Sequence, residues 1–168
     1  MSLYDLTVPQ LTKCLRNLDH WLEAASKHAE HKKFDVNNLL KARLAPDQFA
    51  FDRQVQAVCD NAKFVAGRLT GKEWPAHPDT ETTVEQLRAR IASVIAFLGT
   101  FTPDDFAGAE ERHISLPWME GKWMTGMEYV SEFALANFYF HYTTAYALLR
   151  HNGVELGKRD FIGGVPMH

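Results

Sequence analysis

Cysteine is scarce in this sequence, and it also lacks long apolar stretches and clusters of one charge. Only two of its 168 residues are cysteines, Cys14 and Cys59, and neither belongs to a CxxC pair. Zinc sites built from cysteine need such spacing, and disulfide-stabilised small domains need several pairs. The sequence therefore predicts no cysteine-based metal site and no disulfide framework, and we expect both thiols to be reduced and buried.

Basic clusters and membrane-spanning segments are missing as well. The formal net charge is -3, and no run of Lys and Arg offers a surface for a phosphate backbone. No segment approaches the roughly 20 apolar residues of a membrane span. The start, MSLYDLTVPQLTKCLRNLD, has neither the positive charge nor the unbroken apolar stretch of a signal peptide. We expect a soluble cytoplasmic protein that contacts neither nucleic acid nor membrane.

The bulk composition is that of a folded chain. Hydrophobic residues make up 46% and charged residues 23%, away from the range in which chains stay disordered. A chain of this length can bury a sizeable core without disulfides or metals. We therefore expect one domain over residues 1–168.

Two amphipathic helices are predicted in the first half. The first covers residues 8–29, where apolar side chains recur every three or four positions. Asp35 is expected to cap a short turn that contains Leu39 and Leu40. Pro46 followed by Asp47 is typical of a helix start, so we expect the second helix to begin there. It should end near residue 70, because Gly71 follows its apolar stripe.

A third helix and a small hairpin should follow. Thr82 with Glu85, or Thr83 with Gln86, forms a capping box before a further apolar stripe at 84–101. The helical period is then lost over 103–126. The segment HISLPWMEGKWMT predicts two short strands joined around residues 120–121. Its two tryptophans could form a pocket lid or a dimer contact, or could simply pack; they are Trp118 and Trp123.

The fourth predicted helix differs from the others. Thr125 and Glu128 form a capping box, and no proline interrupts the chain up to Asn152, before Gly153. This helix is apolar nearly all round, which indicates burial on several sides or a subunit interface. The tail beyond it should pack back as a loop through Phe161. Together these elements predict an all-α four-helix bundle with one long cross-connection and a β-hairpin between the third and fourth helices.

Polar residues on the fourth helix form its most informative feature. Asn137, His141 and Thr144 lie one above another on one face, at positions typical of a core. Leaving such a group buried and unpaired costs about 1 to 3 kcal/mol, so each needs a partner or a ligand. One interpretation is a pocket in which His141 carries a proton or binds a metal. The other is an internal hydrogen-bond network that fixes the register of the helices.

The second helix offers possible partners for His141. Gln54 and Asn61 flank its apolar stripe and could face the fourth helix, or could be ordinary boundary residues. Cys59 is also near, but nothing close in sequence would lower its pKa, so a buried thiol is the favoured interpretation over a nucleophile.

Other chemistry-bearing residues point to surface roles. His28 and His31 lie in a polar C-terminal helical turn, where cationic groups suit the helix dipole, and with His20 they are expected on the surface. Glu110 and Glu111 are adjacent, so their carboxylates should diverge rather than pair for acid and base work.

Four segments carry a family resemblance: MSLYDLTVPQ, LLKARLAPDQF, RQVQAVCDNAK and, above all, FALANFYFHYTTAYALLRHNGVELGKRDFIGG. With these segments the whole chain resembles the DUF-1993-type proteins, an uncharacterised branch of the DinB/YfiT-like superfamily. That resemblance implies a four-helix bundle that is commonly dimeric.

The superfamily resemblance also implies a position for a metal. Characterised relatives hold a divalent ion with one histidine from the second helix and an HxxxH pair on the fourth, for thiol-transferase or hydrolase chemistry. Matching that pair to this sequence puts its second histidine on His141 and its first on Asn137. The second helix has no histidine. Amides are poor ligands for zinc or nickel, so the resemblance implies a degraded metal site.

Three functions remain open. The first is a small-molecule pocket in which Gln54, Asn137, His141 and Thr144 bind the ligand and His141 is the catalytic candidate, with no cofactor. The second is a divalent-metal enzyme, using zinc or nickel, in which Asp60 supplies an oxygen ligand beside His141. The third is a non-enzymatic homodimer that uses the aromatic surplus of the fourth helix in its interface.

Overall fold

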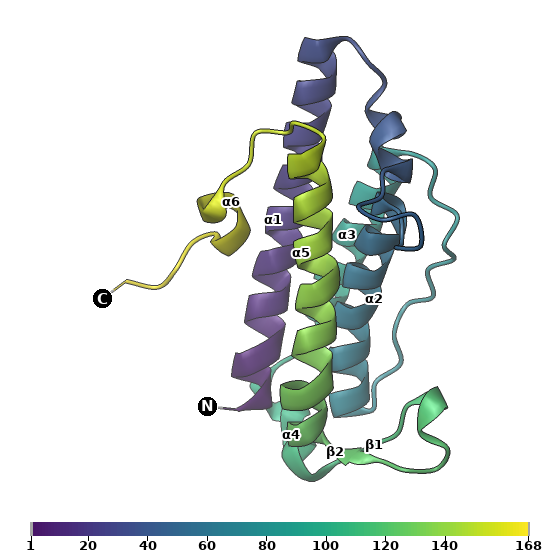
Figure 1. The fold of residues 1–168 in the computed structure, drawn as a ribbon. Coiled ribbons are helices and arrows are strands. Elements are labelled where there is room, and N and C mark those ends of the chain that lie inside the picture. Colours follow the sequence, from purple (N-terminus) through teal and green to yellow (C-terminus); the bar gives the residue numbers. More distant parts are fainter. Residues whose placement is uncertain (1, 168) are drawn as a thin grey trace.

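Four long helices lie side by side in the structure, a computed structural model that describes residues 2–167 (Figure 1). They are α1 (Leu3–Lys32), α2 (Phe51–Thr70), α3 (Val84–Leu98) and a composite fourth helix that ends in α5 (Leu135–His151). The segment 72–83, called the strap below, runs the length of α2 and returns the chain to the other end of the bundle. The predicted all-α bundle with one long cross-connection is therefore confirmed.

Capping chemistry explains where the helices begin. Ser2 and Asp5 form a capping box at the start of α1, and Thr83 and Gln86 form the predicted one at the start of α3. Asp35 caps the predicted short turn, a 3₁₀ helix over Val36–Lys41, by accepting from the amide of Asn37.

The predicted start of the second helix was wrong. The chain near Pro46 and Asp47 forms a turn, in which the amide of Gln48 donates to the carbonyl of Ala45, and α2 begins only at Phe51. The reason is tertiary, because the amide of Phe51 donates to the carbonyl of Ala42 and so holds this loop against the preceding 3₁₀ turn. The predicted end is confirmed, with Gly71 in the left-handed conformation at φ 77°.

The predicted hairpin is present. Strands β1 (His113–Ile114) and β2 (Met124–Thr125) pair antiparallel, with His113 opposite Thr125. Helix α4 (Gly126–Glu128) follows directly, capped by Thr125 and Glu128 as predicted. A Cβ atom at Gly126 would lie 1.9 Å from the carbonyl oxygen of Ala109, so only glycine allows the chain to pass here.

A π-helical segment, Tyr129–Ala134, joins α4 to α5 and was not predicted. The amide of Leu135, the residue that follows this segment, donates to the carbonyl of Val130, five residues back. Such a segment adds a residue to the turn and so rotates everything that follows relative to an uninterrupted α-helix. As a result Phe138 and Tyr142 face the core, whereas Asn137 and His141 are half-buried at its edge.

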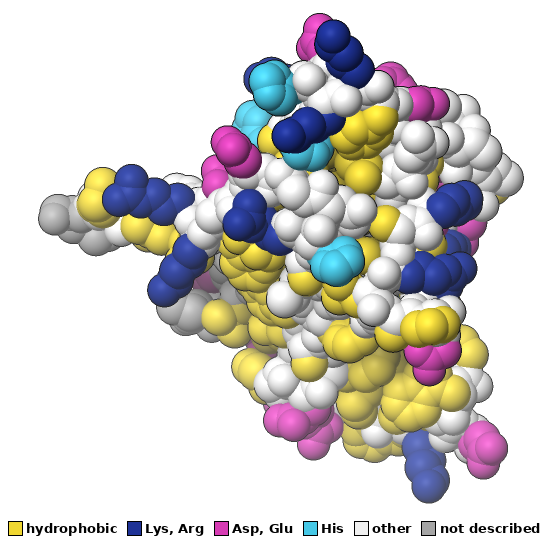
Figure 2. All heavy atoms as spheres, turned by 45° about the horizontal axis from the view of Figure 1, so that its top comes forward, with side chains coloured by type: hydrophobic (Ala, Val, Ile, Leu, Met, Phe, Trp, Pro, Cys, Tyr) yellow, Lys and Arg dark blue, Asp and Glu magenta, His cyan; other side chains and the backbone are white. Residues whose placement is uncertain are grey.

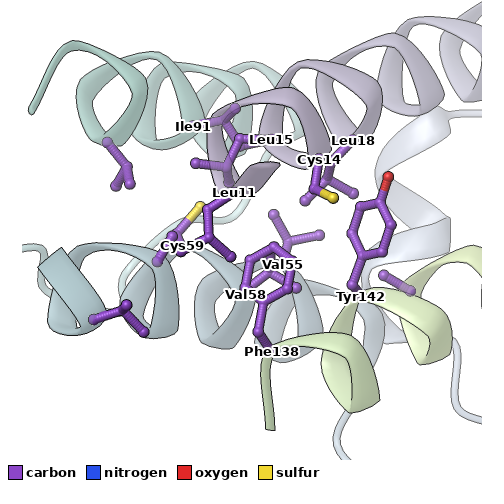
Figure 3. Packing of buried hydrophobic residues seen from close by; sticks show 14 of the residues in the cluster. Leu11, Cys14, Leu15, Leu18, Val55, Val58, Cys59, Ile91, Phe138 and Tyr142 are labelled. Carbon is purple, nitrogen blue, oxygen red and sulfur yellow. The ribbon is translucent and has the colours of Figure 1, made fainter. Parts of the chain in front are cut away.

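The core lies between the four helices. In Figure 3, Leu11 and Cys14 of α1, Val58 of α2, and Phe138 and Tyr142 of α5 point into the common space. Both cysteines are free and buried, as expected, and burial raises the pKa of the Cys59 thiol to about 12. No helix within residues 2–167 has the length and apolar character needed to cross a bilayer.

The C-terminal tail packs back on the bundle through Phe161, as predicted. It contains a short helix, α6 (Lys158–Ile162), that was not predicted. The ring of Phe161 lies 4.8 Å from that of Tyr142 and 5.9 Å from that of Trp21. The indole N–H of Trp21 donates to the carbonyl of Asp160 at 3.1 Å.

Candidate functional site

Two polar pairs cross the seam between α2 and α5. Nδ2 of Asn137 donates to Oδ1 of Asn61 at 2.5 Å, and Nδ1 of His141 lies 2.8 Å from Oε1 of Gln54. Each pair joins one residue of α2 to one of α5, so the two helices are tied at two levels. Gln54, one of two possible partners of His141, makes that contact, and Asn61 contacts Asn137 instead.

The environment of Gln54 fixes the proton on His141. Gln54 is fully buried, and its Nε2 donates to the carbonyl of Phe49 at 3.1 Å. Its Oε1, which can only accept, therefore faces the imidazole, and Nδ1 of His141 must carry the hydrogen. Nε2 of His141 keeps a lone pair and has no hydrogen-bond partner among residues 2–167. Burial, aided by the cation of Arg53, lowers the pKa of His141, so this lone pair is present at neutral pH.

Exposed aromatic rings flank this imidazole. Phe49 stacks nearly parallel to His141, with 6.2 Å between ring centroids, and Phe140 meets it edge-on at 5.2 Å. Phe49 is 49% exposed and Phe140 is 56% exposed. Large apolar groups are usually buried, so their exposure beside a proton acceptor marks a surface able to contact another molecule.

Thr144 is also part of the predicted site, but its hydroxyl is already used. Its Oγ1 donates to the carbonyl of Phe140, one turn earlier on α5, at 2.7 Å. The side chain is buried and contacts neither Gln54 nor His141 through a hydrogen bond. Asn61, not Thr144, completes the polar seam.

A divalent metal does not fit this donor set. The seam offers one imidazole and three amides, the amides are engaged in hydrogen bonds, and zinc or nickel favours imidazole and thiolate. Within residues 2–167, no three His, Cys, Asp or Glu side chains cluster to hold a metal. Asp60, the candidate oxygen ligand, instead pairs with Arg90 at 2.7 Å and Lys63 at 2.8 Å.

The histidines of α1 lie outside the seam. His20 and His31 are exposed, and His28 packs against Phe34 with 5.8 Å between ring centroids. A cavity of 540 Å³ opens at this end of the bundle, lined by Ala24, Lys27, His28, His31, Lys32, Gly153 and Glu155. Figure 2 shows histidine and basic side chains gathered near the top of the view. The surface location expected for His20 and His31 is confirmed.

Sequence reasoning missed a buried ionic cluster between α2, α3 and the strap. The guanidinium of Arg90, on α3, binds Asp60 at 2.7 Å, Asp79 at 2.9 Å and Glu81 at 3.0 Å. Its side chain is 1% exposed. Lys63 pairs with Asp60 as well, so the cluster fastens the strap to two helices.

A histidine of the strap joins this cluster. Nδ1 of His77 lies 3.1 Å from Nζ of Lys63, and its Nε2 lies 3.0 Å from the hydroxyl of Ser93 on α3. Burial and the cations of Lys63 and Arg90 lower the pKa of His77, although Asp60 and Glu81 oppose this. His77 is thus held neutral in the folded protein at pH 7.

These two histidines predict how stability depends on pH. The pKa values of His77 and His141 are both lowered in the folded state, so the unfolded chain binds more protons near pH 6. The two histidines should make their full contribution to the free energy of unfolding above about pH 6.5, the pKa of histidine in the unfolded chain. This contribution should be lost as the pH falls below that value toward the lower pKa values of the folded protein. Urea midpoints at pH 7.5 and 5.5 should therefore differ, with the lower midpoint at pH 5.5. A double variant His77→Gln, His141→Leu should lose much of that difference, and an equal difference in the variant would contradict the assignment.

The fold and the seam together define the class of protein: a four-helix bundle with a strap between its second and third helices and a histidine on its fourth. The family model "Domain of unknown function (DUF1993)" matches residues 3–162, and the chain belongs to this family. The predicted family is confirmed.

A solved structure supports the same assignment. The crystal structure of a DinB family member protein from Shewanella denitrificans is 51% identical, with a TM-score of 0.96. The match covers 99% of this chain and 94% of that one. A search of curated proteins gives no match.

Proposed function

We propose that the protein binds a small organic molecule at the seam between α2 and α5, without a metal. The molecule carries a hydrogen-bond donor next to a ring. The observation that supports this most directly is Nε2 of His141, a lone pair held in one tautomer by Gln54 and lacking a partner within residues 2–167. The exposed rings of Phe49 and Phe140 supply an apolar surface on either side of it.

The chemistry of this site is proton acceptance. The donor of the bound molecule hydrogen-bonds to Nε2 of His141, and Gln54 stabilises the imidazole from the other side. Asn137 and Asn61 hold the helices in register one turn away. Because Cys14 and Cys59 are unpaired thiols, we propose that the protein acts in the reducing cytoplasm.

A phenol tests the proposal, because it combines a hydroxyl donor with a ring. p-Cresol titrated into ¹⁵N-labelled protein should shift the His141 ring nitrogens and the amides near Phe49 saturably. His141→Leu removes the acceptor, and its affinity for p-cresol should fall at least about tenfold, the worth of a buried hydrogen bond. Gln54→Leu removes the group that holds the hydrogen on Nδ1 of His141, so it should weaken p-cresol binding, but less than His141→Leu does. His20→Leu, at an exposed position on α1, is the matched control and should change nothing.

Two results would overturn the proposal. One is equal p-cresol affinity in the protein and in His141→Leu. The other is evidence that the protein binds a metal. Elemental analysis would find a stoichiometric divalent ion, or zinc, nickel or manganese ions would raise the melting temperature in a way that depends on His141. That result would favour the metalloenzyme alternative.

Phe140 is 56% exposed on a face of α5 where Ala136 and Thr143 are exposed too, and this favours a second candidate, a homodimer through this face. In that case the polar pairs only fix register, and the double variant Gln54→Leu, His141→Leu, which replaces both partners of one pair by apolar groups, should keep the fold and its stability. Sedimentation equilibrium distinguishes the two candidates: a dimer that Phe140→Asp converts to a monomer supports the second.

A further inference from the structure

A second cavity opens at the C-terminal end of α2, beside the hairpin. Its volume is 430 Å³, and its lining residues are Gly67, Arg68, Gly71, Lys72, Glu73 and Trp74. Gln54 and Arg68 lie 14 positions apart on α2, about 20 Å along the helix axis. This cavity is therefore separate from the seam that contains His141.

Arg68 enters the cavity with most of its hydrogen-bonding capacity unused. Its guanidinium lies 4.8 Å from the ring centroid of Phe64, 5.9 Å from that of Trp74 and 5.8 Å from that of Tyr129. Nη1 donates to the hydroxyl of Tyr129 at 3.1 Å. A guanidinium has five N–H donors, and Arg68 forms no ion pair with any carboxylate in residues 2–167.

A second guanidinium, that of the exposed Arg112, lies near Gly71, which lines the cavity. Nη1 of Arg112 is 3.1 Å from the position that a Cβ atom would take at Gly71, and Arg112 likewise forms no ion pair in the described part of the chain. Lys72 differs, because it pairs with Asp105 at 2.6 Å. Arg68 lines the cavity, and the guanidinium of Arg112 lies beside Gly71, another of its lining residues.

The indole of Trp74 also lines the cavity, next to Arg68, and the backbone leaves room for it. A Cβ atom at Gly67 would lie 2.3 Å from Cε3 of Trp74 and 2.9 Å from the carbonyl oxygen of Lys72. Glycine inside a helix is destabilising relative to alanine. Gly67 therefore lowers the stability of α2, but it allows the indole of Trp74 to approach the helix closely. Trp74 nevertheless stays 40% exposed, with a planar surface available beside the cations.

We propose that this cavity binds a small planar aromatic carboxylate. The guanidinium of Arg68, assisted by Arg112, holds the carboxylate, and the ring lies on Trp74. Glu73 and the carbonyl end of α2 add negative potential, which favours a single carboxylate charge over a doubly charged phosphate. The site is independent of the function proposed for His141.

Benzoate is the probe. Titrated into the ¹⁵N-labelled protein, it should shift the indole N–H of Trp74 and the amides of Gly67 and Gly71 saturably. Benzamide lacks the charge and cyclohexanecarboxylate lacks the planar ring, and each should bind at least about tenfold more weakly. These comparisons use the unaltered protein, so they do not depend on any variant folding. Equal binding of either analogue would overturn the proposal.

Variants locate the site. Arg68→Gln should abolish saturable benzoate shifts, whereas Arg68→Lys keeps the charge without the planar fork and should bind weakly. Arg16→Gln, at an exposed position on α1, and His141→Leu, at the other site, should bind benzoate as the unaltered protein does. Unchanged benzoate binding in Arg68→Gln would contradict the assignment, whatever p-cresol does at His141.

Discussion

Replacing Arg90 with methionine should destabilise the protein by about 3 to 5 kcal/mol, the cost of removing one partner from a buried ionic cluster. Methionine fills similar space but leaves the carboxylates of Asp60, Asp79 and Glu81 without their shared cation. The free energy of unfolding of natural domains is only about 5 to 15 kcal/mol, so Arg90→Met should remove a large part of it. Urea unfolding followed by circular dichroism measures it.

Arg88 is the matched control for Arg90. It lies two residues earlier on α3 and binds Asp19 through two nitrogens, at 2.7 and 2.9 Å, but its side chain is 39% exposed. Ion pairs open to solvent contribute about 0 to 1 kcal/mol, so Arg88→Met should cost no more than that. If Arg90→Met and Arg88→Met lowered the free energy of unfolding equally, burial of Arg90 would not explain the stability that its ion pairs contribute.

The pH dependence of the Arg90 variant provides a second check. Burial alone would raise the pKa of Asp79 and Glu81, but their hydrogen bonds with Arg90, and with Arg53 in the case of Asp79, lower both overall. Their contribution to stability is present above the unfolded carboxyl pKa and is lost as pH falls through the lower folded value. The stability gap between the unaltered protein and Arg90→Met should therefore narrow below about pH 4.5.

Local sequence signals were sufficient for most of the fold. Apolar periodicity and the boxes at Thr83 and Thr125 act within a few residues, so helices and their starts can be recognised without tertiary information. The start at Asp47 was wrong because a hydrogen bond outside the helical pattern, from the amide of Phe51 to the carbonyl of Ala42 nine residues earlier, decided it. The π-helical segment Tyr129–Ala134 depends on how the fourth helix packs, and periodicity does not report that.

The candidate site was predictable in part. Placing polar residues on facing helices suggested that Gln54 or Asn61 would meet His141, and the structure resolves this as Gln54. The rings of Phe49 and Phe140 could not be assigned, because Phe49 comes from a loop and Phe140 lies outside the polar row of its helix, on the exposed surface beside His141. Arg90 did leave a signal: it stands three residues after Leu87, at the edge of the apolar stripe of α3.

Trp21→Ala should be about as damaging as the loss of Arg90, at about 3 to 5 kcal/mol. Trp21 is fully buried on α1, and its ring lies 4.5 Å from that of Tyr142 and 5.4 Å from that of Tyr146. Truncation leaves a large cavity between α1 and α5. It also removes the donor to the carbonyl of Asp160, so α6 loses both an apolar contact and a hydrogen bond.

The loss at Trp21 should therefore appear twice, in global unfolding by urea and in faster proteolysis of the chain beyond Gly153. Trp21→Phe keeps part of the aromatic packing but not the N–H donor, and should release the tail while costing less global stability. Trp123 is the control, because it is 50% exposed and, within residues 2–167, its ring stacks only on His113 of the hairpin. Trp123→Ala should cost less than about 1 kcal/mol, the usual range for surface changes. If Trp21→Ala unfolded with the same midpoint as Trp123→Ala, packing of the tail against α1 and α5 would contribute little to this fold.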